Sequence, residues 1–376
     1  MSNKPIKIAL IYDAIFPFVK GGSEKRFYEI GRRLARDGDD VHLYGMKTWE
    51  GPNVIRQEGI TLHGICKKYP LYIKSGKRSI FQPLLFGLAT FRLWREPFDV
   101  VDCCGFPYFS LFPMRLITWI RKKPLCSTWH EVWGRKYWKE YLGKLGIFGY
   151  GVEYIAVRLP DVIISVSDNT TKDIRNHLGR KGTIVTITNG IDLEKIRAVE
   201  RAKETSDVIF VGRLLPYKNV DKLIEAVAVV KKKYPKIVFF IIGDGPERDK
   251  LEKLVEDLDL KENVRFFGFL EREEEVFSYM KSSKMLALPS SREGFGIVVL
   301  ESGACDLPVL TIDHSKNAAR HLIKNNNGIV TKLDTESLAV GITELLRNTK
   351  NWELQQDIED YDWDKITQAV RKQLHF

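Results

Sequence analysis

Short apolar segments alternate with amphipathic ones along the chain, and this series runs twice. Ile6–Tyr12 is a compact apolar run, and Glu24–Arg36 after it carries apolar residues at helical spacing with charges on the other face. Val208–Val211 starts a second series, followed by the loop Gly212–Asn219 and a helix from Asp221. Strands separated by amphipathic helices indicate doubly wound parallel sheets. The chain is therefore expected to form two similar α/β units.

Further apolar runs complete each series. They are Val41–Tyr44, Val100–Cys103, Leu125–Trp129 and Asp161–Ser167 in the first, and Val238–Ile242, Arg265–Phe267, Met285–Pro289 and Pro308–Ile312 in the second. The polar stretch Glu194–Ser206 between the series is the predicted linker, and a length of 376 residues agrees with two domains. In open parallel sheets ligands bind beyond the carboxyl ends of the strands, so functional side chains are expected in the loops there.

The positive charge of the chain lies in its first half. Residues 1–190 hold 30 Lys and Arg against 17 Asp and Glu, a net charge of +13. Residues 191–376 hold 29 against 32, a net charge of −3. This asymmetry indicates that the first half meets an anionic partner.

The cysteines and the apolar runs bear on location. The five cysteines contain no C-x-x-C pair, so reduced thiols are expected. The chain opens without a secretory signal pattern, and its longest apolar stretch, Ile80–Phe91, is too short to span a bilayer. A cytoplasmic location is the expectation.

The strongest functional signal is a pair of glutamates after a predicted strand. Glu293 lies in the loop after Met285–Pro289, and Glu301 is expected about two turns inside the next helix. At 1.5 Å per residue their carboxylates are roughly 10–12 Å apart, which suits two parts of one extended ligand. Gly294 and Gly296 allow close backbone approach, and a helix start favours phosphate or sugar oxygens. A carboxylate inside the helix suits ribose hydroxyls. Two solvated glutamates are the structural alternative.

Two further loops carry groups that suit a diphosphate. Arg213 and Lys218 stand in G-R-x-x-P-x-K after Val208–Val211, and a guanidinium with a mobile ammonium is a sound pair for a diphosphate leaving group. Gly21 and Gly22, at the first strand–helix turn, would let backbone amides approach a phosphate. Ordinary surface cations and a simple turn are the alternatives.

A histidine ends another predicted strand. Ser127–Glu131 reads Ser-Thr-Trp-His-Glu, which places His130 at the carboxyl end of Leu125–Trp129. An imidazole at that end would donate to a sugar hydroxyl. A structural histidine is the alternative.

Together these segments resemble glycosyltransferase family 4, the retaining nucleotide-sugar transferases of GT-B fold. The resemblance covers essentially the whole chain and includes Asn189–Asp192 and the G-D-G-P turn at Gly243–Pro246. It implies an α/β GT-B fold, with two doubly wound Rossmann-like domains facing across a cleft. The implied domains are 1–190 for the acceptor, 191–360 for the nucleotide-sugar donor, and 361–376 for a C-terminal helix, around Trp363–Leu374, that returns to the first domain.

The resemblance implies four catalytic residues. Arg213 and Lys218 would hold the donor diphosphate and neutralise the charge that grows on it as it leaves. Glu293 would face the donor sugar. His130 would contact that sugar near its sixth carbon.

It also implies the remaining donor contacts. The backbone at Gly21 and Gly22 would help to hold the diphosphate, and Glu301 would take the ribose hydroxyls. The nucleobase would lie against the Gly268–Leu270 loop, which includes Phe269. The amides of Gly294, Phe295 and Gly296 would surround the sugar hydroxyls and the phosphate.

The implied reaction transfers a sugar from a UDP- or GDP-sugar to a hydroxyl of a glycan or lipid-linked acceptor, with retention and without a metal or other cofactor. The acceptor would attack from the face that the diphosphate leaves, with the departing phosphate oxygen as its base. Glu293 as a nucleophile is the other possibility. Assembly of cell-envelope polysaccharide, glycolipid or protein glycan would fit.

This chain departs from the family pattern at three places. The family often has glycine where this chain has Asn219 and Asp306. It often carries a Gly-Gly turn and a glutamate where this chain has Asp313–Arg320. Because the third segment is expected near the donor diphosphate and sugar, it puts the identity of the sugar in doubt more than the reaction class.

Two basic segments indicate a membrane partner. Arg135–Lys144 mixes cations with Trp and Tyr, and Lys67–Arg78 adds Lys67, Lys68, Lys74, Lys77 and Arg78. Cations beside aromatic residues suit an anionic membrane surface. The hypothesis is a peripheral contact of the first domain with such a surface, near a lipid-linked acceptor. Solvated basic faces are the alternative.

Two segments match the metal-binding D-x-D pattern of the other major glycosyltransferase fold. Asp37-Gly38-Asp39 closes a predicted helix, where Asp and Gly are ordinary turn residues. Asp360–Asp364 begins the last predicted helix, where aspartate favours the dipole. Both are expected to be structural.

Three other classes of protein share some of these features. A nucleotide-sugar epimerase or hydrolase would share the diphosphate site. A nucleic-acid-binding protein would fit the basic isoelectric point of about 9.1, but the chain has no recognised motif of that kind. A nicotinamide-dependent oxidoreductase is disfavoured because neither first strand–helix turn carries G-x-G-x-x-G.

Overall fold

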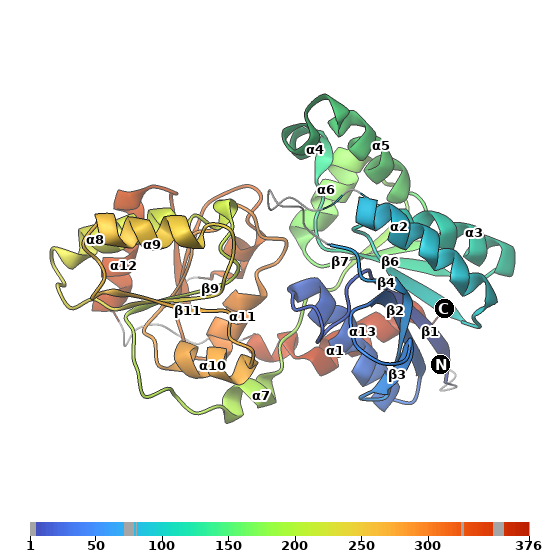
Figure 1. Cartoon of the computed structure of the whole chain (residues 1–376), viewed down its shortest axis with the longest axis horizontal. Helices are drawn as coiled ribbons and strands as arrows, with labels where there is room; N and C mark the ends of the chain where they lie inside the picture. The colour runs from blue at the N-terminus through green and yellow to red at the C-terminus, as the bar shows by residue number, and fades with distance from the viewer. Residues whose placement is uncertain (1–4, 71–78, 80, 325–326, 349–356, 376) are drawn as a thin grey trace. The chain divides into compact units, whose positions relative to one another are not determined.

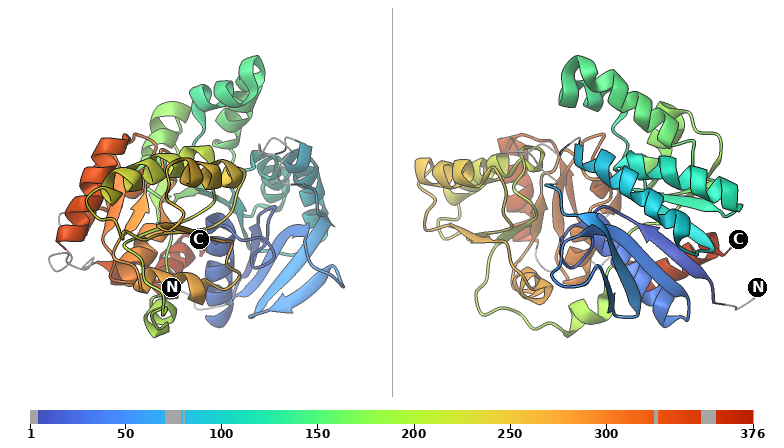
Figure 2. Two further views of the ribbon diagram at one scale, coloured as in Figure 1. Left: turned by 60° about the vertical axis from the view of Figure 1, so that its left-hand side comes forward. Right: turned by 45° about the vertical axis from the view of Figure 1, so that its right-hand side comes forward.

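The computed structural model describes residues 5–70, 79, 81–324, 327–348 and 357–375. Its internal contacts divide the chain into two units, each of which is described by itself. Unit 1 comprises residues 1–189 and 363–376, and unit 2 comprises residues 190–362. Figures 1 and 2 show the ribbon.

Unit 1 is built on an eight-stranded sheet of order β3-β4-β2-β1-β5-β6-β7-β8. β3 pairs with β4 antiparallel, and the other pairs are parallel. The strands are β1 (Lys7–Ile11), β2 (Asp40–Lys47), β3 (Val54–Gln57), β4 (Ile60–Lys67), β5 (Val100–Cys104), β6 (Leu125–Trp129), β7 (Val162–Ser165) and β8 (Thr183–Thr186).

Helices cover both faces of this sheet (Figure 1). They are α1 (Gly22–Arg36), α2 (Phe81–Ala89), α3 (Leu111–Arg121), α4 (Gly134–Leu142), α5 (Gly146–Ala156), α6 (Asp168–Leu178) and α13 (Trp363–Leu374), with the 3-10 helices η1 (Thr90–Arg95), η2 (Tyr108–Ser110) and η3 (Gly143–Leu145). Ile8 and Leu10 of β1 pack in one core with residues of α1 and α13. Ala9 and Ile11 pack in the other core, with residues of α2, α3 and α5. Successive side chains of a strand face opposite sides, so β1 supplies both cores.

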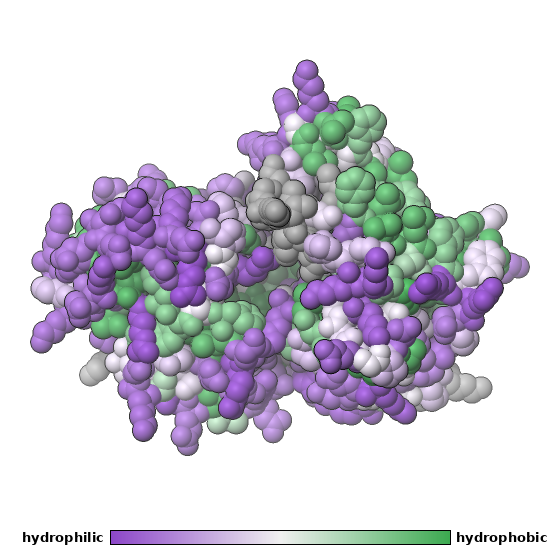
Figure 3. All heavy atoms as spheres, viewed as in Figure 1, coloured by the Kyte–Doolittle hydropathy of each residue, from purple (hydrophilic) through white to green (hydrophobic). Residues whose placement is uncertain are grey.

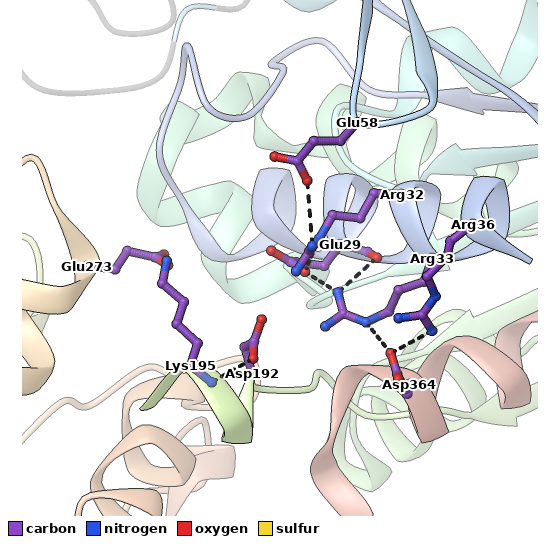
Figure 4. A network of polar contacts seen from close by, with 9 residues as sticks. All are labelled: Glu29, Arg32, Arg33, Arg36, Glu58, Asp192, Lys195, Glu273 and Asp364. Carbon is purple, nitrogen blue, oxygen red and sulfur yellow. Dashed lines mark hydrogen bonds and ion pairs between the residues drawn. The ribbon is translucent and has the colours of Figure 1, made fainter. Parts of the chain in front are cut away.

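The C-terminal helix α13 packs on α1, as the resemblance implied, and ion pairs hold it (Figure 4). Asp364 lies 2.6 Å from Nε of Arg33 and 3.1 Å from Arg36. Near its other end, Arg371 Nε lies 3.1 Å from the fully buried carboxylate of Asp39. Asp39 belongs to one of the two D-x-D segments and Asp364 to the other. Both carboxylates form ion pairs that attach α13 to the rest of unit 1.

Unit 2 is built on a six-stranded parallel sheet of order β11-β10-β9-β12-β13-β14. The strands are β9 (Val208–Val211), β10 (Phe239–Ile242), β11 (Val264–Gly268), β12 (Leu286–Leu288), β13 (Val309–Ile312) and β14 (Gly328–Thr331). The helices are α7 (Leu193–Ala198), α8 (Val220–Lys231), α9 (Arg248–Asp257), α10 (Glu273–Lys281), α11 (Ile297–Ala304) and α12 (Thr335–Arg347), with η4 (Pro216–Lys218), η5 (Ala318–Leu322) and η6 (Ile358–Tyr361). The doubly wound α/β class predicted for both halves is confirmed.

The prediction that Glu194–Ser206 is a linker is wrong, because this polar stretch packs onto the rest of unit 2. Helix α7 occupies its first part, and Lys195 pairs with Glu273 at 3.3 Å, as Figure 4 shows. Further along, the amide of Ala202 donates to the carbonyl of Ser278 at 3.1 Å. Its polar residues therefore make ion pairs and backbone hydrogen bonds with α10 rather than a free connection.

Every helix within the described part of the chain is too short or too polar to cross a membrane.

Candidate active site

The centre of the unit 2 sheet is where its strand order reverses. β9 lies between β10 and β12, so the chain winds outward in one direction through β10 and β11 and in the other through β13 and β14. Ligands of open α/β sheets bind beyond the carboxyl ends of the strands at such a reversal. The two loops at this point follow β9 and β12, and they carry Arg213, Lys218 and Glu293.

Lys218 and Glu293 form an ion pair at this reversal point. Lys218 Nζ lies 2.5 Å from Glu293 Oε1, and the two side chains are only 13% and 14% exposed. The backbone joins the same loops, since the amide of Ser291 donates to the carbonyl of Tyr217 at 2.9 Å. The side chain of Asn219 donates to the carbonyl of Pro289 at 2.8 Å. Two residues that are 75 positions apart in the sequence are thus held as one charged pair.

Arg213 lies on the same loop, and the G-D-G-P turn supports the backbone around it. A Cβ at Gly243 would lie 1.9 Å from the carbonyl oxygen of Gly212, and one at Gly245 would lie 2.3 Å from that of Leu214. The amide of Leu214 donates to the carbonyl of Asp244 at 2.9 Å. Both glycines are therefore required by close backbone contact, and the turn fixes the loop from which the exposed Arg213 side chain projects.

The segment that departs from the family pattern forms a turn against Glu293. The amide of Glu293 donates to the carbonyl of Lys316 at 3.0 Å, and the amide of Ala318 donates back to Glu293 at 2.9 Å. The fully buried side chain of Asn317 donates to the carbonyl of Ile312 at 2.9 Å. Asp313–Arg320 thus positions the Glu293 backbone through its own hydrogen bonds.

The helix after Glu293 begins later than the sequence analysis expected. α11 starts at Ile297, so Glu301 is its fifth residue, about one turn inside rather than two. Gly296 precedes it with φ +93°, and a Cβ there would lie 2.5 Å from the Cβ of Ala319. Phe295 is buried and packs near the ring of Tyr361, so only its backbone faces the loop exterior. Gly296 is the position of this loop that demands glycine.

The two glycine departures, Asn219 and Asp306, both have left-handed backbone. Their φ values are +52° and +62°. Asn and Asp are the non-glycine residues that visit this region most readily, because their short polar side chains bond locally. At both positions the backbone therefore has the conformation that favours glycine.

We expect Asp306→Gly to raise the free energy of unfolding by roughly 0.5–1 kcal/mol, because glycine removes the steric cost of the left-handed conformation at this exposed position. Urea denaturation measures the change. Lys253→Gly, on an exposed face of α9, is the opposite control and should lower stability by about 1 kcal/mol. Equal losses in both variants would contradict the argument.

Phe269 follows β11, the edge strand of the unit 2 sheet, with β10 between it and β9. Gly268 before it has φ +70°, and the Phe269 ring is 52% exposed. The loop thus offers an aromatic face at the carboxyl edge of unit 2, where the sequence analysis expected a nucleobase contact.

Gly21 and Gly22 lie in unit 1 at the N-terminus of α1. They stand ten residues after β1 ends, so the turn is longer than expected. Gly21 has φ −172°, which any residue adopts, and a Cβ there would meet the carboxylate of Glu24 at 2.3 Å. The space beside Gly21 is therefore occupied by the side chain of Glu24, in the first turn of α1. The sequence motifs did not point to Glu24.

His130 directly follows β6 and is half-buried. Removal of the ring from water, together with the Arg26 guanidinium, lowers the pKa of His130 to about 3. Its Nε2 atom is buried and has no hydrogen-bond partner among the described residues. At neutral pH the ring is uncharged, with one N–H donor and one acceptor, which suits hydrogen bonding to a hydroxyl.

Two buried charged residues near His130, Arg26 and Asp102, were not predicted from the sequence. Arg26 of α1 is fully buried and donates from Nη2 to the carbonyl of Ile187 at 3.0 Å. Asp102 of β5 accepts from the hydroxyl of Thr128 at 2.8 Å. Burial raises the pKa of Asp102 to about 6, against the opposing hydrogen bond and the Arg26 charge. Neither residue lies in a motif, so only the folded sheet brings them together.

Because the folded protein holds a proton on Asp102 to a higher pH than the unfolded chain, stability should fall as pH rises from about 4 to 6. Asp102→Asn is expected to flatten this fall, whose size is at most about 3 kcal/mol. Urea denaturation at four pH values between 4 and 7 measures it. The control is Asp99→Asn, since Lys123 and Lys7 lower the pKa of that carboxyl and its effect lies below this window. An unchanged slope in Asp102→Asn would contradict the assignment.

Among the described residues, no three His, Cys, Asp or Glu side chains gather as a metal site would require.

Two family models match this chain. The model for group 1 glycosyl transferases matches residues 192–362, and the model for Glycosyltransferase Family 4 matches residues 20–195. The chain belongs to glycosyltransferase family 4. The resemblance drawn from the motifs is thereby confirmed, and the protein is a glycosyltransferase.

Relatives and solved structures agree with this membership. An uncharacterized glycosyltransferase of Haemophilus influenzae is 28% identical over 352 residues, 92% of this chain and 94% of its own. The N-acetylgalactosamine-N,N'-diacetylbacillosaminyl-diphospho-undecaprenol 4-alpha-N-acetylgalactosaminyltransferase of Campylobacter jejuni is 36% identical over 167 residues, 43% of this chain and 44% of its own. Anabaena HepE, solved in complex with UDP and glucose, superposes with a TM-score of 0.73 at 19% identity, over 98% of this chain and 99% of its own. The GT-B fold of this transferase is confirmed.

Proposed function

We propose that this transferase moves a sugar, with retention, from a UDP- or GDP-sugar to a hydroxyl of a glycan or lipid-linked acceptor during assembly of a cell-envelope polysaccharide, glycolipid or glycan. The observation that carries the proposal is the partly buried Lys218–Glu293 pair at the reversal point of unit 2, with Arg213 on the same loop as Lys218. Two cations and one carboxylate on neighbouring loops suit a sugar joined to a diphosphate.

The donor would lie along the carboxyl edge of unit 2. Arg213 and Lys218 would bind the diphosphate, and Glu301 would accept from the ribose hydroxyls. The exposed Phe269 ring would stack on the base. The backbone of Gly294, Phe295 and Gly296 would complete the contacts from unit 2, and the proposed role of Gly21 and Gly22 stays a prediction from the sequence. HepE, which shares the fold, was solved with UDP, which supports a uridine nucleotide as the first donor to test.

In the proposed step, the bond from the anomeric carbon to the diphosphate breaks while the acceptor oxygen bonds to the same face. The acceptor proton passes to the departing phosphate oxygen. Arg213 and Lys218 stabilise the negative charge of the leaving diphosphate, which removes the need for a metal or other cofactor. Because an ammonium already occupies one oxygen of Glu293, the proposed role of that carboxylate is to bind the sugar rather than to attack it.

His130 would bind a sugar hydroxyl as a neutral ring. With a pKa of about 3 it is a poor general base, so its proposed contribution is one hydrogen bond. The activity of this transferase should therefore show no titration from His130 between pH 5 and 8.

The acceptor would be lipid-linked and near a membrane. The Campylobacter relative carries diphospho-undecaprenol in its name, which supports this acceptor class. The basic first half supports peripheral contact with an anionic surface on the cytoplasmic side. Exposed cations of Arg135–Lys144 and Lys67 and Lys68 remain candidates, whereas Lys74, Lys77 and Arg78 lie outside the described residues.

The test is a thermal-shift screen with UDP, GDP, ADP and their sugar conjugates, with EDTA present. One nucleotide should raise the melting temperature, since a ligand that binds the folded state stabilises it. The shift should weaken in Arg213→Ala and Glu301→Ala. Absence of any shift, with or without magnesium, would overturn the donor-site proposal.

A further inference from the structure

Unit 1 contains an apolar pocket that no part of the donor site uses. It lies among α2, η2, α4 and α5 and has a volume of about 280 Å³. Aromatic and aliphatic side chains line it, including Tyr108, Trp133, Trp138, Tyr141, Phe148 and Val152. A pocket with such walls takes a hydrocarbon ligand rather than a glycan, whose hydroxyls would find no partners there.

A buried carboxylate holds the walls of this pocket in place. Glu153 of α5 is fully buried and accepts four hydrogen bonds. Tyr108 Oη and Trp138 Nε1 each donate at 2.9 Å, and the amides of Trp133 and Gly134 donate at 2.7 and 2.9 Å. The Tyr108 hydroxyl and the Trp138 indole N–H are thus turned to Glu153, and the Trp133 indole N–H donates to Glu131 at 2.6 Å. The apolar faces of these rings line the pocket. Because hydrogen bonds hold the rings in place, the pocket is preformed.

The pocket opens onto an exposed apolar face of unit 1. Leu145 and Phe148 line the pocket and are also 63% and 70% exposed, so they belong to both. Figure 3 shows hydrophobic side chains gathered over α5, α2 and α3. We define the apolar face by the exposed residues Phe81, Leu84, Leu85, Leu88, Leu116, Trp119, Ile120, Leu145, Ile147, Phe148 and Ile155. A patch of this kind marks an interaction surface.

Cations outnumber carboxylates at the border of this face, where Glu140 of α4 is also exposed. Helices α2 and α3 carry no acidic residue, and the one acid of α5 is the buried Glu153. The exposed cations on the neighbouring elements are Arg92, Arg95, Lys122, Arg135, Lys136, Lys139, Lys144 and Arg158. An apolar face bordered by cations complements a hydrocarbon chain that carries an anionic headgroup.

We propose that this pocket binds the hydrocarbon chain of the lipid-linked acceptor, while the apolar face rests in the membrane from which that lipid comes. The proposal rests on the proposed function for the acceptor class. It names the site that recognises the lipid part of the acceptor, with Glu153 as the residue that positions its aromatic walls. A cavity of about 280 Å³ accommodates a short alkyl segment.

The first experiment measures binding of n-alkyl phosphates of four to fourteen carbons, each below its micelle concentration, by tryptophan fluorescence. Affinity should rise about fourfold per methylene over the shorter chains and level off once the chain fills the pocket. Inorganic phosphate should not bind measurably. A rise that continues without levelling would indicate surface adsorption and would overturn the proposal, as would no binding at any length.

Variants then locate the site. Val152→Phe fills the pocket and should weaken decyl phosphate binding at least tenfold. Val340→Phe, at an exposed position of α12 in unit 2, is the matched control and should leave binding unchanged. Trp119→Ser, on the apolar face but outside the pocket, should weaken vesicle flotation with anionic lipid and leave decyl phosphate binding unchanged. If Val152→Phe lowers the melting temperature, Leu142→Phe supplies the same test. Unaltered binding in a folded filled variant would overturn the assignment.

Two further arms identify the occupant. Short-chain phosphatidylglycerol should compete more weakly than decyl phosphate, because it carries two chains and the pocket is proposed to hold one. Stronger competition than that of decyl phosphate would assign the pocket to bilayer lipid instead. Light scattering should show that Trp119→Ser leaves the oligomeric state unchanged, and dissociation of a dimer would assign the face to a second copy.

Transfer assays separate this proposal from the proposed function. Val152→Phe should raise KM for a lipid-linked acceptor at least tenfold and leave transfer to the same glycan without its lipid unchanged. Equal effects on both acceptors would overturn the proposal. If the wild-type protein binds alkyl phosphates but transfers sugar from no nucleotide sugar to any acceptor, only the proposed function is contradicted.

Discussion

Replacing Lys218 with alanine is expected to lower kcat by about 10²–10³-fold, with little change in the fold of unit 2. The ammonium lies 2.5 Å from Glu293 and both side chains are largely removed from water. Losing one preorganised charge at a developing anion has a cost of this order. The remaining carboxylate would then stand unpaired beside the bound diphosphate and repel it, so KM for the donor should rise as well. Steady-state kinetics with the nucleotide sugar identified by the thermal-shift screen give both values.

A matched ion pair in the same unit supplies the control. Lys222 of α8 pairs with Glu225 at 2.8 Å, but these side chains are 42% and 31% exposed. An exposed pair contributes little, so Lys222→Ala should change kcat less than twofold. If Lys218→Ala and Lys222→Ala have equal effects, the proposed role of Lys218 fails.

A double-mutant cycle with Glu293→Gln tests whether the pair acts as one unit. If Lys218 and Glu293 act through each other, the double variant should lose much less than the product of the two single losses. Strictly multiplicative losses would show that each residue contacts the donor independently. In that case the ion pair observed between them would have no part in the reaction.

The sequence predicted the central strands of both units because buried parallel strands are continuous apolar runs. β1, β6 and β9 lie within one or two residues of the runs that predicted them. The β3–β4 hairpin was missed, since Val54–Gln57 at the sheet edge is half exposed and carries no such run. The linker was misassigned because polarity alone does not distinguish a free connection from a segment held by ion pairs to α10.

The motifs predicted which residues of unit 2 form the candidate donor site, but not which of them contact one another. Spacing along one chain relates Glu293 to Glu301, which share a loop and a helix, whereas the pairing of Glu293 with Lys218 depends on β9 and β12 lying side by side in the sheet. The buried charged groups of unit 1 had almost no sequence signal. Arg26 looks like an ordinary charged residue on an amphipathic helix, and only packing shows that it is enclosed. A glutamate in the otherwise uncharged α5 was the one available hint.

Replacing Glu153 with alanine should be the most destabilising single change in unit 1. Two backbone amides, the Tyr108 hydroxyl and the Trp138 indole N–H would lose their shared acceptor inside the core. Each buried donor left without a partner costs about 1–3 kcal/mol, so the free energy of unfolding should fall by at least about 4 kcal/mol. That is a large part of the 5–15 kcal/mol typical of a whole domain. Urea denaturation followed by tryptophan fluorescence measures it.

Two further variants make this result interpretable. Glu153→Gln keeps the shape and one acceptor oxygen but turns an NH₂ group toward the remaining donors, so its loss should fall between those of wild type and Glu153→Ala. Glu140→Ala, at an exposed position of neighbouring α4, should stay within about 0.5 kcal/mol of wild type. Burial raises the pKa of Glu153 while its four donors oppose the shift. The carboxylate therefore costs free energy in the core, and that cost is offset only while all four donors point at it. A loss below about 1 kcal/mol in Glu153→Ala would mean that the aromatic walls of the pocket are held by their own packing rather than by this carboxylate.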